Sequence, residues 1–209
     1  NMLAVDGRCK TFDDSADGYG RSEGCGIVVL RRLSDAIKDN NNIIGLLRGS
    51  SVKQDGRSGG LTVPNGIAQQ RVMEDALANG ALTASDINYV EAHGTGTSLG
   101  DPIEMSAINE VFSSAANTTT PIPVGSVKGN IGHMEAAAGM GGLIKVILQL
   151  QDNTIYPHIN MDTPSSHIPW ERYSLNVPQQ SQDWQAKTKR SIINSFGFAG
   201  TVASLVVEQ

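Results

Sequence analysis

The sequence has little cysteine and no long run of one charge sign, and each shortage excludes a class of protein. Its 209 residues include two cysteines, Cys9 and Cys25, too few for a disulfide framework in a chain of this length. It contains neither a Cys-x-x-Cys nor a His-Glu-x-x-His pattern, so we expect no metal site. The formal net charge of −5, without a lysine or arginine run, argues against binding to nucleic acid.

Long hydrophobic runs are also missing. No apolar run approaches the ~20 residues that a helix needs to span a bilayer. The first residues lack the charged-then-apolar pattern of a secretory signal. The sequence therefore predicts a cytoplasmic protein that binds no membrane. Its length allows one large domain or two small ones.

Apolar runs typical of strands alternate along the chain with patterns typical of helices. The β-branched run Ile27–Leu30 predicts a strand over 25–31 that is buried on both faces. This alternation predicts an α/β fold with a mostly parallel sheet covered by helices. The other predicted strands are 43–52, 87–92, 122–128 and two around the glycine-rich turn at 197–200, and the predicted helices are 34–38, 67–78, 102–112 and 135–151.

His93 lies in a glycine-rich stretch between a predicted strand and a predicted helix. Residues 91–104 read Glu-Ala-His-Gly-Thr-Gly-Thr-Ser-Leu-Gly-Asp-Pro-Ile-Glu. The glycines let the backbone come close to a ligand, and Thr95 and Thr97 would face the same way if the loop is extended. Pro102 suits the start of the following helix. A single histidine is most often structural, so the context decides its meaning.

A second histidine occupies a similar position. Residues 124–133 read Val-Gly-Ser-Val-Lys-Gly-Asn-Ile-Gly-His, and a helix rich in alanine and glycine follows. Two such loops would place His93 and His133 at neighbouring strand ends, where ligands bind in α/β sheets. Small residues suit a helix that packs very close to another backbone, so we expect 135–151 to be a central, buried helix.

The two loops, in this order, resemble the two histidine motifs of β-ketoacyl synthases, which are the condensing enzymes of polyketide and fatty-acid assembly. The modular polyketide synthases are the most similar members. The resemblance covers nearly the whole chain. It implies the thiolase-like fold, an αβαβα layered sandwich of two similar halves. In that plan residues 1–42 are the tail of the N-terminal half, and residues 43–209 are essentially the C-terminal half.

The family's nucleophile is a cysteine in an Asp-Thr-Ala-Cys-Ser-Ser-like motif of the first half, and this sequence lacks that motif. We expect Cys9 and Cys25 to be ordinary thiols. The resemblance implies that a partner N-terminal half supplies the sulfur, and that this chain alone is incomplete. The other implied partners are an acyl carrier protein and a second copy in a homodimer. The resemblance implies no intrinsic cofactor, since the substrates are carried on the phosphopantetheine of the carrier protein.

The resemblance also assigns roles in decarboxylative Claisen condensation. His93 and His133 would donate N–H bonds to the enolate oxygen that forms when a malonyl thioester loses CO2. Two close imidazoles disfavour double protonation, which would help to keep them neutral. Lys128 and Glu104 would form a buried pair that holds His133 in place.

Three further residues match positions that contact substrate in the family. The backbone N–H of Phe198 would help to hold the acyl thioester oxygen, and its ring would gate acyl entry. Thr95 and Thr97 would bind the phosphopantetheine arm. One departure stands out: many polyketide ketosynthases read Gly-Thr-Asn-Ala-His where residues 200–204 read Gly-Thr-Val-Ala-Ser. Loss of the asparagine amide would alter hydrogen bonding in this turn.

Two other functions fit parts of the sequence. A ketosynthase-like scaffold could bind carrier protein or dimerise without condensing activity, since the nucleophile motif is missing. Thiolase-type degradative chemistry fits less well, because that family uses a second cysteine where these motifs offer none. The complete set of His93, His133, Lys128 and Glu104 favours a condensing enzyme.

Overall fold

One mixed sheet organises the part of the chain that the computed structural model describes, residues 2–57, 59–60, 63–113 and 120–209. Strands β7, β2, β3 and β5 run parallel, whereas β8 runs antiparallel to both β7 and β1. The parallel centre was predicted; β7 and β8 are antiparallel because a tight turn joins them. In spatial order the strands are β1 (Leu46–Gln54), β8 (Thr201–Glu208), β7 (Arg190–Phe196), β2 (Tyr89–Glu91), β3 (Ile122–Gly125) and β5 (Leu175–Asn176).

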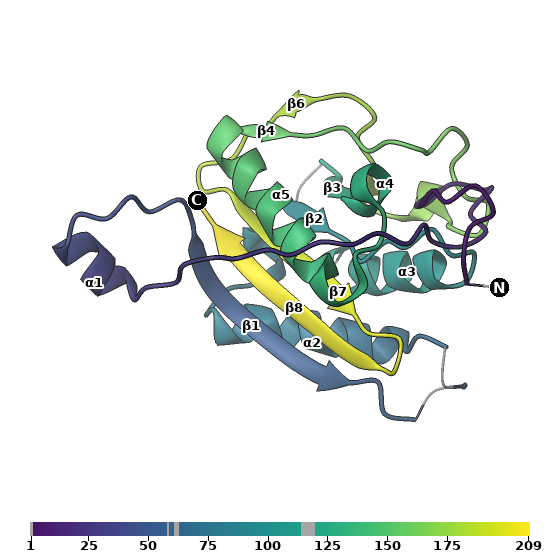
Figure 1. Ribbon diagram of the computed structural model, residues 1–209, viewed down its shortest axis with the longest axis horizontal. Helices are drawn as coiled ribbons and strands as arrows, with labels where there is room; N and C mark the ends of the chain where they lie inside the picture. The colour runs from purple at the N-terminus through teal and green to yellow at the C-terminus, as the bar shows by residue number, and fades with distance from the viewer. Residues whose placement is uncertain (1, 58, 61–62, 114–119) are drawn as a thin grey trace.

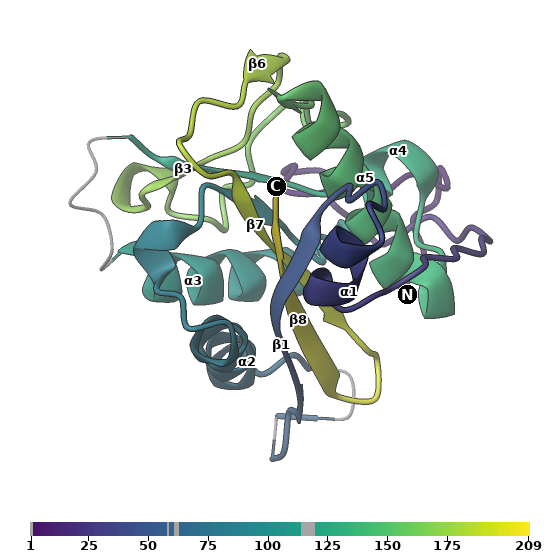
Figure 2. The ribbon, with the colours of Figure 1, turned by 90° about the vertical axis from the view of Figure 1, so that its left-hand side faces the viewer.

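Helices cover both faces of this sheet (Figures 1 and 2). Helix α2 (Gly66–Asn79) packs on β1 and β8 beside α3 (Gly100–Ser113), and α5 (Ala138–Asp152) packs on β7 from the opposite face. The described chain thus forms a three-layered αβα unit. The remaining elements are α1 (Leu33–Lys38), α4 (Lys128–Ile131), the 3-10 helices η1 (Ala84–Asp86), η2 (Glu135–Ala137) and η3 (Trp170–Arg172), and a small sheet of β4 (Thr154–Ile155) and β6 (Gln182–Asp183). None of the helices in the described ranges combines the length and the apolar character of a membrane span.

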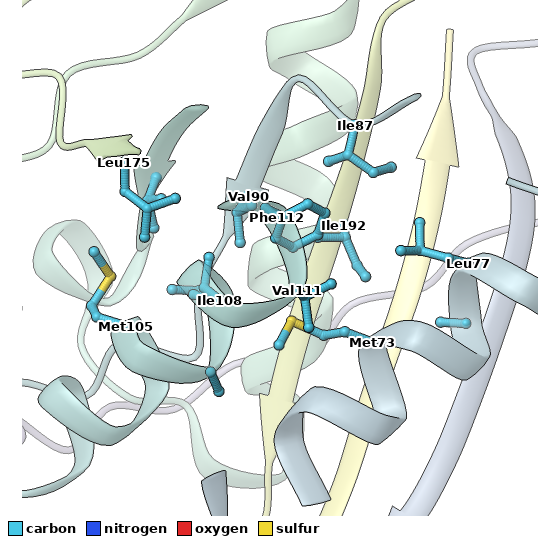
Figure 3. Close-up of a cluster of buried hydrophobic side chains, with 14 of the residues drawn as sticks. Met73, Leu77, Ile87, Val90, Met105, Ile108, Val111, Phe112, Leu175 and Ile192 are labelled. Atoms are coloured by element: carbon cyan, nitrogen blue, oxygen red, sulfur yellow. The ribbon is translucent and has the colours of Figure 1, made fainter. Parts of the chain in front are cut away.

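The larger core lies between the sheet and the α2–α3 layer (Figure 3). Side chains of both helices, including Met73, Met105 and Phe112, meet the strand residues Val90 and Ile192, and all five are at most 1% exposed. This packing fixes the ends of β2 and α3, between which the first histidine loop runs.

The predicted strand over 25–31 is wrong. Among the described residues this run pairs with no strand, and Ile27 and Val29 are 86% and 95% exposed. A β-branched run becomes a buried strand only where neighbouring strands and a covering layer receive it. Here the segment crosses α5 instead, so closely that a Cβ on Gly26 would come within 2.9 Å of the Met140 side chain (Figure 1).

Helix α5 packs as closely as its small residues predicted, but only one of its faces is buried. A Cβ on Gly142 would come within 3.2 Å of both the Glu91 and the Ile193 side chain. On the opposite face Ile144 and Leu148 are 41% and 46% exposed, so the described part of the chain does not bury that face. Its predicted range is also divided, because η2 precedes α5.

A buried ion pair joins α5 to the central strand. Lys145 Nζ lies 2.7 Å from Glu91 Oε2, and the two side chains are 9% and 2% exposed. The Tyr89 hydroxyl donates to the same carboxylate at 2.8 Å, while the backbone N–H of Val127 donates to Glu91 Oε1 at 2.6 Å. These contacts satisfy a carboxylate that would otherwise be costly to bury.

Replacing Lys145 with alanine should lower the free energy of unfolding by about 3–5 kcal/mol, because Glu91 would stay buried without its cation. The matched control is Lys53→Ala, which breaks an ion pair with Asp75 whose side chains are 36% and 51% exposed. That change should cost less than about 1 kcal/mol. Denaturant-induced unfolding measures both, and equal losses would contradict a stabilising role for the buried pair.

Candidate functional site

The fold brings the two histidine loops together. The ring centroids of His93 and His133 lie 5.4 Å apart, with the ring planes at 85°. His93 lies two residues after the end of β2, and His133 lies two residues after the end of α4. The second loop is fixed by the N-terminal segment, since His133 N donates to Gly20 O at 2.7 Å and Ser22 N donates to His133 O at 3.0 Å.

Backbone hydrogen bonds orient both rings in the same way. Phe196 N–H donates to His93 Nδ1 at 3.3 Å, and Glu135 N–H donates to His133 Nδ1 at 3.0 Å. A neutral imidazole that accepts at Nδ1 carries its proton on Nε2. Both histidines line one cavity of about 710 Å³, so the two Nε2–H groups are available as donors to a ligand there.

The surroundings keep both rings neutral. Burial lowers the pKa of His133 to about 4, and the charge of Lys128 acts in the same direction. Burial, then Lys128, then His133 itself hold the pKa of His93 well below its usual value. His133 therefore contributes to the low pKa of His93, but burial is the largest cause of the neutrality of both rings.

Glu104 holds the first histidine loop. Its carboxylate accepts the backbone N–H of His93 at 2.7 Å and that of Gly94 at 2.8 Å. Burial raises the pKa of Glu104, and these two hydrogen bonds oppose that effect. Because Glu104 lies in the first turns of α3, a helix that packs in the core sets where His93 sits.

A second buried carboxylate, Asp101, ties the same loop to the N-terminal segment. It accepts from Gly96 N at 3.1 Å and from Thr97 N at 3.4 Å, while its other oxygen accepts from Phe12 N at 2.9 Å. Burial raises the pKa of Asp101 to about 7, in spite of these donors. Asp101 was not among the site residues predicted from the sequence, although it stands in the same motif as Glu104.

The predicted contact between Lys128 and Glu104 is not formed. Lys128 is only 3% exposed, yet its ammonium takes part in none of the ion pairs within 4 Å found in the described part of the chain. Its influence acts at longer range, lowering the pKa of both histidines, while Glu104 and Glu91 oppose the burial that lowers its own pKa. Glu104 binds the backbone of the first loop and not the second.

The three other predicted residues line the same cavity as the histidines. Thr95 Oγ1 and Thr97 Oγ1 lie 3.3 Å apart, so the two hydroxyls face the same way as expected. Phe198 is 58% exposed on the turn between β7 and β8, beside the cavity.

The turn that departs from the family pattern closes without an asparagine. Gly197 N donates to Thr201 O at 2.6 Å, and Gly200 N donates to Gly197 O at 2.9 Å. Gly200 takes a φ of 90°, which glycine adopts at little cost. Val202 is 2% exposed in a small apolar cluster with Val72. The turn is therefore closed by its own backbone, and the Gln54 side chain adds a hydrogen bond to Ala199 O at 3.3 Å.

A third histidine, His158, hydrogen-bonds to the backbone of two segments that adjoin the first histidine loop. Its Nε2 lies 3.0 Å from Thr11 O, and its Nδ1 accepts from Ser126 N at 3.4 Å. The Ser126 hydroxyl in turn donates to Gly94 O at 3.0 Å. His158 was not predicted to be part of the site, because nothing beside it in the chain marks it as close to these loops.

Neither cysteine resembles an activated nucleophile. Cys9 is 1% exposed and accepts from Gly20 N at 3.3 Å, and burial raises the pKa of its thiol. A catalytic thiol needs the opposite shift. Cys25 is exposed. In the ranges that the structure describes, no three His, Cys, Asp or Glu residues gather in a way that could hold a metal ion.

Comparisons with known proteins place these observations in a family. The model of the β-ketoacyl synthase C-terminal domain matches residues 44–162, and that of the β-ketoacyl synthase N-terminal domain matches residues 1–36. The division after residue 42 and the extent of the second half to residue 209 stay predictions.

Curated relatives include large polyketide synthases. A phenolphthiocerol/phthiocerol polyketide synthase of Mycobacterium tuberculosis is 49% identical over 210 residues, which cover 100% of this chain and 10% of that protein. Erythronolide synthase EryA3 of Saccharopolyspora erythraea is 46% identical over 209 residues, covering 99% of this chain and 7% of that protein. The chain thus spans about a tenth or less of these relatives.

Solved ketosynthases share the fold. The ketosynthase from module 6 of the bacillaene synthase of Bacillus subtilis 168 matches with a TM-score of 0.95 and 40% identity, covering 99% of this chain and 38% of that one. The oxazolomycin ketosynthase domain OzmH KS7 of Streptomyces albus JA3453 matches with a TM-score of 0.95 and 35% identity, covering 100% of this chain and 37% of that one. The chain therefore belongs to the β-ketoacyl synthase family, with the thiolase-like fold, and corresponds to the C-terminal portion of a polyketide synthase ketosynthase.

Proposed function

We propose that this chain supplies the decarboxylation site of a polyketide-type β-ketoacyl synthase. The observation that carries the proposal is the pair of neutral imidazoles, His93 and His133, whose Nε2–H groups serve one cavity. The reaction is the condensation of an acyl thioester with a malonyl-type thioester on acyl carrier protein.

The reaction requires hydrogen-bond donors at the atom where negative charge develops. The bond between the malonyl carboxylate and its α-carbon breaks, CO2 leaves, and the electron pair is delocalised onto the thioester oxygen as an enolate. Donors that are already in place stabilise that oxygen without reorganisation. The enolate carbon then attacks the acyl thioester carbonyl, a carbon–carbon bond forms, and the cysteine thiolate is released. His93 and His133 donate to the enolate oxygen, and the charge of Lys128 adds a favourable field.

The remaining residues would bind the two thioesters. Thr95 and Thr97 are placed to hold the phosphopantetheine arm, and the Phe198 N–H is assigned to the acyl thioester oxygen, with its ring at the entrance. The partners in this proposal are an N-terminal ketosynthase half that bears the nucleophilic cysteine, an acyl carrier protein and a second copy of the chain. We place the assembly in the cytoplasm.

A scaffold without condensing activity is the second candidate. It is favoured by the absence of an activated thiol among the described residues, since burial raises the pKa of Cys9. It is disfavoured by the hydrogen bonds that orient both imidazoles, because a docking surface has no need of two aligned ring donors.

In the assembly with its nucleophile-bearing half, His133→Ala should lower malonyl thioester decarboxylation by about a hundredfold or more, because one enolate donor is removed. Release of CO2 from a labelled malonyl thioester measures the rate. His167→Ala is the matched control, since His167 is exposed and lies outside the cavity lining. An unchanged rate in His133→Ala would overturn the assignment and favour the scaffold.

The imidazole of His133 should not titrate between pH 8 and about pH 5, because burial and Lys128 lower its pKa to about 4. Histidine ring resonances in NMR spectra, assigned with the alanine variants, follow the titration directly. In the denatured protein the same ring should titrate near the ordinary value of about 6.5. Protonation of the folded protein at that ordinary pH would show that the site is wetter than the structure indicates.

A further inference from the structure

A hydrogen-bonded series of buried polar side chains connects strand β8 to the first histidine loop. The Ser204 hydroxyl donates to Asn194 Oδ1 at 2.8 Å, and the two residues are direct cross-strand partners in the β7–β8 pair. Asn194 Nδ2 then faces Glu104 Oε1 at 3.4 Å. All three side chains are at most 3% exposed, so the water that could replace these contacts is excluded.

This series of polar contacts ends on the backbone that carries His93. Glu104 Oε1, which faces the Asn194 amide, also accepts the His93 N–H at 2.7 Å, and the second oxygen accepts from Gly94 N at 2.8 Å. The position of the carboxylate therefore depends on donors from two sides, the loop on one side and β7 on the other.

The Glu104 carboxylate determines which end of the Asn194 amide faces it. With Oδ1 accepting from the Ser204 hydroxyl, Nδ2 faces Glu104 Oε1 and also lies 3.4 Å from Met73 Sδ. The reversed amide would put its oxygen against a carboxylate oxygen, which is repulsive, whereas the Ser204 hydroxyl can pair with either end because it both donates and accepts. Ser204 also occupies one of the positions at which the chain departs from the Gly-Thr-Asn-Ala-His pattern.

We propose that Asn194 is a positioning residue for His93 that acts through Glu104. The inference rests on the proposed role of His93 in decarboxylation. Asn194 touches neither histidine ring; its contribution is to keep the Glu104 carboxylate charged and in place, so that the carboxylate keeps its two backbone N–H donors.

The charged and titratable groups around Glu104 are Asp101 on the same helix, Lys128 from α4 and the His93 ring. Burial raises the pKa of Glu104, whereas its backbone donors, Lys128 and the Asn194 amide lower it. Losing the amide therefore favours the protonated carboxyl group at a higher pH. A protonated carboxyl group accepts more weakly, and the His93 loop loosens.

The test compares Asn194→Leu with Asn194→Ala in the assembly with the nucleophile-bearing half. Leu has about the size of Asn but no N–H donor, and it adds no charge beside Glu104. If Asn194 positions Glu104 through its amide, Asn194→Leu should lower kcat for decarboxylation tenfold or more with KM little changed, as Asn194→Ala does. If Asn194 only fills space, Asn194→Leu should keep kcat near that of the unchanged protein, which would overturn the proposal.

A second measurement does not depend on activity. The amide resonances of His93 and Gly94 report the ionisation of Glu104, and that of Gly96 reports Asp101. The pH midpoint of the shifts at His93 and Gly94 should move to higher pH in both Asn194 variants, while that of Gly96 moves less. Unmoved midpoints at His93 and Gly94 would overturn the proposal even if activity falls.

Two further variants separate the causes. Ser191→Ala changes a buried serine of β7 that has no contact to Glu104, and it should leave kcat and the midpoints at His93 and Gly94 unchanged. His93→Ala tests the proposed function alone: full activity there would refute the role of His93, whereas the amide midpoints would still decide whether Asn194 controls Glu104.

Discussion

The site depends on a buried carboxylate that binds backbone rather than a cation. Glu104 and Asp101 both lie at the start of α3, where the helix dipole favours negative charge. Together they accept the N–H groups of His93, Gly94, Gly96 and Thr97. A glycine-rich loop has many accessible conformations, and fixing it costs entropy. Hydrogen bonds to charged acceptors are among the strongest available in a protein interior, so two carboxylates can hold this loop in one conformation.

The burial that strengthens those hydrogen bonds also determines the charge of the neighbouring groups. It lowers the pKa of His93 and His133 and raises that of Asp101 and Glu104. Lys128, placed among them without an ion-pair partner within 4 Å in the described ranges, keeps the histidines neutral through its charge. Burial of one region therefore accounts both for the strength of the loop's hydrogen bonds and, with Lys128, for the protonation state of the rings.

Local patterns in the sequence predicted what adjacent residues determine: the strand–loop–helix units, the two histidine loops and the hairpin at the end. Contacts between distant segments could not be read in this way. His158 meets Thr11 across 147 residues, and Asn194 meets Glu104 across 90. The partner expected for Lys128 was wrong for the same reason, because the resemblance identified a buried carboxylate but not the backbone groups that bind it. The strand over 25–31 failed because propensity alone does not supply a neighbouring strand.

That extended segment has a consequence for handling the protein. Ile27, Val29 and Leu30 are 86%, 95% and 67% exposed in a run of four apolar residues with no charge and no proline. Segments of this composition with open backbone edges are templates for pairing between molecules and for aggregation. The behaviour of the chain at high concentration is therefore governed by whether this run is covered, and a lysine on its exposed side would act as a gatekeeper against association.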